Sequence, residues 1–351
     1  MNPVIGVQHS KDLDSHWRAP LLISGTADWR FKAITKYLVS PPLITEKPSN
    51  SSFPYDVRCL VWPGTNQKRN ILESKNLRVF IRDVKNKDEL LDFFADAKKA
   101  IHLHIITPPS YDNPTYWYKG NLSAIETLHI LGRENGVKRF FILAHASTIK
   151  TITQLNGLHG LELTPTLQSG EETDVSPLMD KPKNRTPVII YPELLAPEAP
   201  WIQYLIQRVM AGRPILVPSH LSKTLYLTYT EDFCTWLLHN LTQQGENASL
   251  FNPPIMSTTI SALIDVIHTA LQDETKQTLL EPRYIKILSP ILHPLFAQEI
   301  IQRLGIRNSA LDWILTATAY RTVQGSQINT TKLSDAIHSV VKMYLRTTSE
   351  T

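Results

Sequence analysis

Residues 21–32 read LLISGTADWRFK and join a short apolar run to an amphipathic segment through a single glycine. The apolar run at 20–24 predicts a buried parallel strand, because such strands are covered on both faces. Apolar residues recur at helical spacing over 29–39, which predicts a helix there. Gly25 therefore lies at a turn that leads from a strand into a helix. The N-terminus of a helix at such a turn has unpaired N–H groups that can bind an anion.

A strand, a glycine turn and a helix are the layout that holds the pyrophosphate of a dinucleotide. With glycines at every third position, the two that follow Gly25 would fall at 28 and 31, where the chain has Asp28 and Phe31. A carboxylate at 28 would repel phosphates, and a ring at 31 would fill the space where helix and strand touch. We therefore expect the scaffold of a nucleotide site with altered chemistry, in which Ser24 and Gly25 are the remaining cofactor-binding residues.

The composition is that of a globular protein. The chain has 351 residues, of which 42% are hydrophobic and 19% charged, and its net charge is +4 with no basic tract. This charge does not indicate nucleic-acid binding. Cys59 and Cys234 are too few and too far apart for a disulfide framework or a zinc cluster, which favours a reducing compartment. Without a membrane-length apolar run or a signal-type N-terminus, we expect a cytoplasmic protein that binds neither nucleic acid nor membrane.

Strand and helix patterns alternate along the first half of the chain and indicate a parallel sheet with helices on both faces. Strands are expected at 57–62, 77–81, 100–106, 140–144 and 187–192, and helices at 87–97 and 121–134. The later patterns predict helices at 199–210, 232–241, 257–271, 292–304 and 331–346, with a strand at 225–229. We therefore predict the α/β class. A doubly wound, Rossmann-like domain spans 1–190, with its last strands supplied by later segments, and a smaller, mainly helical lobe spans 191–351.

The order of these motifs resembles that of the extended short-chain dehydrogenases/reductases, the family of NAD-dependent nucleotide-sugar epimerases and dehydratases. The resemblance covers most of 20–345 and rests on the following segments: VRCLVWPG at 57–64, RDV at 82–84, IHLH at 101–104, the Asn-led segment from 121, GVKRF at 136–140, IYP at 190–192 and TYTED at 228–232. It implies an NAD(P) cofactor, with Asp83 and Val84 at the adenine and Asn121 beside the cofactor.

Several departures from the family pattern affect the chemistry. Trp62 stands where the family has a residue that grips the adenosine ribose, and His145 stands where it has a catalytic Ser or Thr. The Tyr-x-x-x-Lys pair is not recoverable: the nearest run, SPLMDK at 176–181, has Leu178 in the Tyr place. That pair supplies a phenol whose pKa a neighbouring ammonium lowers for proton transfer. We therefore expect the hydride relay to be lost and NAD(P) to bind weakly or not at all.

His145 is the first catalytic candidate, because it ends a central strand at the edge where open α/β sheets bind ligands. It would act there as a general acid or base, or fill the vacant site as a buried, hydrogen-bonded histidine. Tyr191 is the second candidate, as a replacement phenol. His102 and His104 share one face of a strand and would line a substrate pocket that converges with His145. No ligand spacing supports a metal.

Two further features are open to more than one interpretation. Tyr116, Trp117 and Tyr118 belong to an aromatic segment that either clamps a planar ligand or packs on the domain. Arg30 either pairs with Asp28 or Glu126, or reaches an anionic ligand at the helix N-terminus.

Three functions follow from the sequence. The first is a non-redox biosynthetic catalyst or a ligand-binding pseudoenzyme that takes a small-molecule ligand. The second is an active NAD(P)-dependent epimerase, dehydratase or reductase with a rearranged site. The third is a structural subunit of an assembly. Because the family's dimer uses the helix that carries the missing Tyr/Lys pair, we expect its oligomeric state to be altered.

Overall fold

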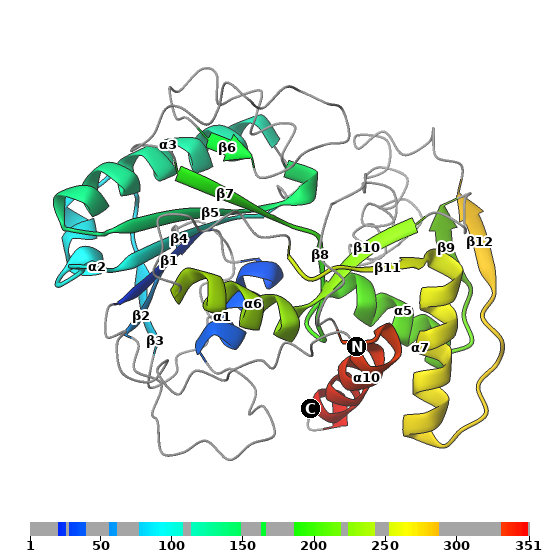
Figure 1. Ribbon diagram of the computed structural model, residues 1–351. Coiled ribbons are helices and arrows are strands. Elements are labelled where there is room, and N and C mark those ends of the chain that lie inside the picture. Colours follow the sequence, from blue (N-terminus) through cyan, green and yellow to red (C-terminus); the bar gives the residue numbers. More distant parts are fainter. Residues whose placement is uncertain are drawn as a thin grey trace, which may run out of the picture.

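A computed structural model shows a parallel sheet covered by helices on both faces, joined to a second lobe of short strands and helices (Figure 1). The structure describes residues 20–25, 28–39, 56–61, 77–107, 114–148, 163–165, 186–218, 224–242, 253–287 and 331–349. The expected helix at 292–304 and the segment at 176–181 lie outside these residues. No helix among the described ranges is long and apolar enough to span a membrane.

The main sheet has seven strands, and every neighbouring pair is parallel. In spatial order they are β3 (Leu77–Ile81), β2 (Val57–Val61), β1 (Leu21–Gly25), β4 (Ile101–Ile106), β5 (Arg139–His145), β7 (Thr186–Tyr191) and β6 (Leu163–Pro165). The predicted α/β class and doubly wound sheet are confirmed. The strand order reverses at β1, so the turn after Gly25 lies where such folds bind ligands. Edge strand β6 was not predicted, because three residues are too few to show a period.

Helices cover the sheet in two layers (Figure 1). On one face, α1 (Trp29–Val39) and α6 (Thr230–Thr242) pack over an apolar cluster that includes Ile34 and Phe233. On the other face lie the 3-10 turn η2 (Asp88–Leu90), α2 (Leu91–Phe94) and α3 (Pro114–Glu134). The segment 232–241, expected in the C-terminal lobe, thus belongs to α6 and packs on the sheet instead.

On the α2/α3 face of the sheet, two helix boundaries differ from the sequence predictions. The helix expected at 87–97 ends at Phe94, and Asp96 has a left-handed backbone with φ 55°. The helix expected from Asn121 begins seven residues earlier, at Pro114, where proline's fixed φ favours the first turn. Asn121 is therefore inside α3 and does not start it, so its place differs from the one that the resemblance implied.

The second lobe surrounds a core of its own. Its strands are β8 (Glu193–Leu195), β10 (Thr224–Tyr229) and β11 (Met256–Thr259) in one sheet, and β9 (Ile215–Pro218) paired with β12 (Tyr284–Ile287). Its helices are α5 (Pro200–Met210), α7 (Ile260–Thr275) and α10 (Leu333–Ser349). The helix expected at 257–271 starts later because its first residues extend β11. The Thr259 hydroxyl then accepts a hydrogen bond from the Ala262 N–H (3.2 Å) and caps α7.

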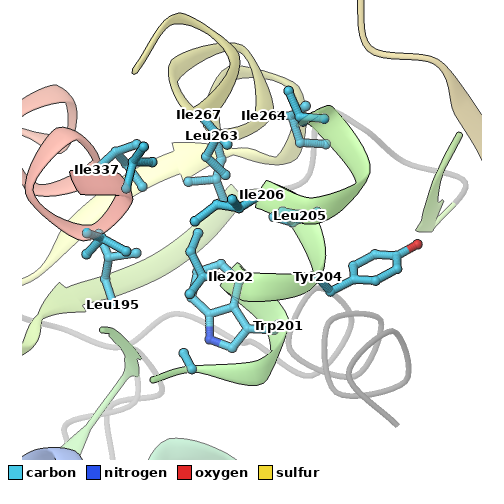
Figure 2. Packing of buried hydrophobic residues seen from close by; sticks show 14 of the residues in the cluster. Leu195, Trp201, Ile202, Tyr204, Leu205, Ile206, Leu263, Ile264, Ile267 and Ile337 are labelled. Atoms are coloured by element: carbon cyan, nitrogen blue, oxygen red, sulfur yellow. The ribbon is translucent and has the colours of Figure 1, made fainter. Parts of the chain in front are cut away.

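Figure 2 shows how aliphatic side chains fill the space between the helices of this lobe. Ile202, Leu205 and Ile206 of α5 face Leu263 and its neighbours on α7, and Ile337 of α10 lies beside them. Trp201 is fully buried at the base of the cluster. The apolar stripes of three helices therefore stabilise this lobe by burial against one another.

We predict that Ile264→Ala destabilises the protein by about 2–5 kcal/mol, because Ile264 is fully buried in this core and truncation leaves a cavity. Ile130→Ala is the control, since Ile130 is 46% exposed on α3 and its loss is worth less than about 0.5 kcal/mol. Unfolding in guanidinium chloride measures both. Equal effects of the two substitutions would contradict the described core.

Candidate functional site

The candidate site lies at the carboxyl ends of the central strands. Gly25 ends β1, Thr107 follows β4, His145 ends β5, and Tyr191 ends β7. Register pairs His145 directly with Tyr191, and their rings lie 5.2 Å apart, edge to face. The sheet thus brings the two catalytic candidates together at the carboxyl edge of β5 and β7.

Asp28 caps the N-terminus of α1. Its Oδ1 accepts a hydrogen bond from the Phe31 N–H at 2.8 Å, and Thr107 donates a further side-chain hydrogen bond to its carboxylate. Although 24% of the side chain remains exposed, desolvation raises the pKa of Asp28 against the opposing effects of Arg30 and these hydrogen bonds. Burial thus disfavours the charged form of the Asp28 side chain more than Arg30 and the hydrogen bonds favour it.

Phe31 covers the glycine turn. A Cβ added to Gly25 would lie 2.5 Å from the Ile105 carbonyl oxygen and 3.1 Å from the Phe31 ring, and Gly25 has φ +155°. Only glycine fits at this position. The absence of a side chain allows β1 to pack closely against β4 and α1. The Phe31 side chain is 1% exposed, so its ring fills the space where helix and strand touch, as expected from the sequence.

A buried ion pair joins α1 to β8. The Arg30 Nε and Nη2 donate to the two carboxylate oxygens of Glu193 at 3.0 and 2.8 Å. Arg30 also lies 3.6 Å from Asp28 and stacks over the Trp29 ring at 4.5 Å. Desolvation opposes the ionisation of Glu193, but Arg30 and His145 outweigh it and lower its pKa to about 2. The expected pairing of Arg30 with Asp28 is present. Its bidentate partner, Glu193, lies 163 residues farther along the chain.

His145 contacts the same carboxylate, with its Nε2 3.4 Å from a Glu193 oxygen. Burial lowers the pKa of His145, and the attraction of Glu193 only partly offsets this effect. The imidazole is therefore neutral near pH 7. The Thr148 hydroxyl donates to the His145 carbonyl oxygen at 2.6 Å and fixes the end of β5.

Tyr191 is fully buried, and its hydroxyl has no hydrogen-bond partner among the described residues. Burial raises the pKa of Tyr191 well above its usual value, and the Asp28 carboxylate adds to the increase. A phenol that relays protons in hydride transfer needs the opposite shift. The site therefore holds a buried phenol in its protonated form.

His102 and His104 do not join this group. Along β4 and β5 the side chains alternate between faces, so His102 and His104 lie on the α2/α3 face while His145 lies on the α1 face. The Ser24 hydroxyl lies between them, 2.7 Å from His102 Nε2 and 2.8 Å from His104 Nδ1. His102 packs edge-on against Phe93, Phe94 and Phe140. The expected convergence with His145 is thus not observed, because the pleat separates the residues.

The remaining predicted residues are spread out. Asp83 accepts the Lys85 N–H at 3.0 Å in the turn after β3, and Val84 packs beside the α2/α3 cluster. The side chains of Asn121 and of Tyr116, Trp117 and Tyr118 lie outside the described part, as does Trp62. Across the described ranges, no three His, Cys, Asp or Glu side chains form a metal site.

Comparison with solved structures identifies the fold. The protein gox2253 superposes with a TM-score of 0.58 at 13% identity, covering 94% of this chain and 98% of its own. UDP-glucose 4-epimerase from Thermotoga maritima gives 0.55 at 14% identity, with 94% and 99% covered. The Bordetella bronchiseptica enzyme WbmH, in complex with NAD+, gives 0.51 at 14%, with the same coverage. No family model matches the chain, and no curated protein matches its sequence.

The chain has the fold of the extended short-chain dehydrogenases/reductases. The resemblance stated from sequence motifs is therefore confirmed at the level of fold. Because each match covers 94% of this chain, it includes the second lobe as well as the sheet.

Sequence reasoning missed Glu193 and Thr107. A signal for Glu193 was present: it is the one charged residue in PVIIYPELLAP, 187–197, where a buried carboxylate requires a cation. Its partner Arg30 similarly interrupts an apolar helix start. Nothing in the sequence indicates that the two meet, because they are 163 residues apart along the chain.

We predict that Glu193→Gln destabilises the protein by about 3–5 kcal/mol, because it leaves the Arg30 guanidinium buried without its bidentate partner. Glu198→Gln, which removes the partly exposed pair with Lys36, is the control and costs no more than about 1 kcal/mol. Thermal and denaturant unfolding provide the comparison. A Glu193 variant as stable as the control would show that the pair is not essential.

We also predict that His102 makes the fold sensitive to acid. Burial lowers the pKa of His102 well below 6.5, and His104 and His129 lower it further, so the folded state holds the neutral form. The contribution of neutral His102 to the free energy of unfolding is complete above pH 6.5. It is lost as the pH falls below that value, by up to about 1.4 kcal/mol per pH unit. Relative to His102→Gln, the wild type should lose stability from pH 6.5 to 5.5 in denaturant titrations. Parallel pH profiles of the two proteins would refute this role.

Proposed function

We propose that this chain keeps the fold of a dinucleotide enzyme while binding dinucleotides weakly or not at all, and that it acts as a ligand-binding pseudoenzyme or a non-redox catalyst. One observation carries the proposal: the Asp28 carboxylate accepts the Phe31 N–H at the N-terminus of α1. In dinucleotide-binding folds this helix end holds the pyrophosphate. Here a side chain of the protein supplies the anion.

Electrostatics disfavours a second anion beside Asp28. Two unit charges 4 Å apart repel by about 4 kcal/mol at the effective dielectric constant of a protein surface. Arg30 offsets this repulsion only in part, because its guanidinium lies 3.6 Å from Asp28 and also bonds both oxygens of Glu193. A pyrophosphate would therefore meet a carboxylate, and Arg30 beside it is already paired with Glu193.

Sterics act in the same direction. The glycine turn of such folds lets the backbone approach the pyrophosphate closely. The Phe31 ring occupies this approach over Gly25. The residues present thus do not fit a dinucleotide bound in the manner of the fold, and no step of hydride transfer is assigned to them.

The polar groups of the site suit binding or proton chemistry without redox. His145 is neutral and held by Glu193, and Tyr191 is protonated beside it. A neutral imidazole can accept a proton from a ligand, and the phenol can donate or accept a hydrogen bond. Either role leaves a ligand unoxidised.

A second candidate is an active NAD(P)-dependent enzyme with a rearranged site. The observation that favours it is the common fold with WbmH, whose structure contains NAD+, and with a Bacillus cereus UDP-glucuronic acid 4-epimerase in complex with NAD. Tyr191 would then have to lie beside the nicotinamide. Its raised pKa is the argument against this reading.

NADH and NADPH fluorescence titrations test the proposal. We expect the wild type to bind either more weakly than about 1 mM, and Asp28→Asn to tighten binding by about tenfold, since asparagine keeps the helix cap without the charge. The double variant Asp28→Gly, Phe31→Gly should bind more tightly still, because it also reopens the space over Gly25. Asp92→Asn, at an exposed site on α2, is the charge-matched control.

A wild-type dissociation constant of about 10 μM or below for either dinucleotide would overturn the proposal. So would an Asp28→Asn variant that binds no better than Asp92→Asn. The single substitution keeps the test valid if the double variant fails to fold.

A further inference from the structure

We infer that His338 is a pH-operated latch: its charged imidazolium fastens the C-terminal helix α10 to α7, and its neutral form gives up one of the bonds that hold it there. The latch lies in the second lobe, on a helix pair outside the candidate site. It does not depend on what that site binds.

Both ring nitrogens of His338 lie against oxygen atoms that accept hydrogen bonds. Nδ1 lies 2.8 Å from the Ser334 carbonyl oxygen, one turn back in α10, and Nε2 lies 3.1 Å from a carboxylate oxygen of Asp273 on α7. A carbonyl oxygen and an ionised carboxylate cannot donate. A neutral imidazole has one N–H and one lone pair, whereas the imidazolium has two N–H groups. Only the charged form therefore donates to both oxygens.

Each neutral tautomer loses one of these two bonds. With the proton on Nδ1, the Nε2 lone pair faces the Asp273 carboxylate. With the proton on Nε2, the Nδ1 lone pair faces the Ser334 carbonyl oxygen. Deprotonation thus breaks either the bond to α7 or the backbone bond that aims the ring at α7.

The neighbours of His338 favour its charged form. The hydrogen bond to Ser334 raises the pKa of His338, Asp273 raises it further, and the Glu274 carboxylate on α7 adds to the increase against the effect of burial. On α10 itself, Asp335 and Lys342 lie one turn to either side of His338.

The other elements that contact α10 keep one charge state near neutral pH. Tyr229 of β10 bonds the Ser339 hydroxyl at 3.0 Å, and burial raises its pKa. Arg208 of α5 lies over the Tyr204 ring, and the β8 glutamate has a pKa of about 2. On α7, the buried His268 lies five residues before Asp273, about 140° around the helix.

The latch acts on a helix that closes the core of the second lobe. Ile337 and Val340 of α10 are fully buried, and Figure 2 shows Ile337 beside Leu195 of β8, the strand that carries the candidate-site glutamate. The start of α10 is tied by Asp232, which accepts the Thr331 N–H at 2.7 Å and its hydroxyl at 2.8 Å. Of these two polar ties, only the one at His338 changes charge between pH 5 and 8.

The direction of the pH dependence follows from the raised pKa of His338. The stabilisation is complete below pH 6.5, the usual pKa of histidine, and is lost as the pH rises through the pKa of the folded state. The side chains of His338 and Asp273 are 33% and 60% exposed, so solvent screens the pair and the change is modest.

An NMR titration of the His338 Cε1–H resonance in the full chain tests the charge. We expect a pKa above 6.5 in the wild type and a lower one in Asp273→Asn. Asp265→Asn is the control, because Asp265 is exposed on α7 about 12 Å from Asp273 along the helix, and it should leave the pKa as in the wild type. A wild-type pKa at or below 6.5, or one that Asp273→Asn does not lower, would overturn the inference.

Hydrogen exchange of the α10 amides tests the latch itself. After correction for the intrinsic rates, protection of α10 in the wild type should fall about twofold to fivefold between pH 6 and pH 8, the effect of a partly exposed ion pair. His338→Gln keeps the buried face of α10 intact and should not show this fall. Equal pH profiles of the two proteins would show that His338 fastens nothing and would overturn the inference.

Discussion

The pair between Arg30 and Glu193 connects the two halves of the molecule. Arg30 belongs to the first turn of α1 on the main sheet, and Glu193 opens β8, which pairs with β10 in the second lobe. Both side chains are buried, so each charge requires the other. The contact also fixes His145, whose Nε2 lies 3.4 Å from the same carboxylate. This ion pair thus links the sheet, the second lobe and the site.

The same pair sets the chemistry of the helix start. Because Arg30 bonds both oxygens of Glu193, it offsets the charge at the N-terminus of α1 only in part. Asp28 remains there as the cap, with Phe31 packed over Gly25. The proposed loss of phosphate-binding chemistry therefore involves neighbouring residues at the start of α1, which contact one another.

Much of the fold could be predicted from the sequence, because its strands are apolar runs and its helices have clear periods. The end of β1 at Gly25 and the packing of the Phe31 ring against it could also be predicted, since both depend on local geometry. The partner of Arg30 and the separation of His104 from His145 could not. The first requires a contact across 163 residues, and the second requires the face of each strand in the assembled sheet. Site geometry of this kind is determined by tertiary packing.

The central claim is that Asp28 occupies the position of the dinucleotide pyrophosphate. A crystal structure of the wild type grown with saturating NAD+ tests it most directly. We predict that the Asp28 carboxylate remains bonded to the Phe31 N–H, that the Phe31 ring remains over Gly25, and that no dinucleotide is bound there. A pyrophosphate on the N-terminus of α1, with the Asp28 side chain turned away, would contradict the account.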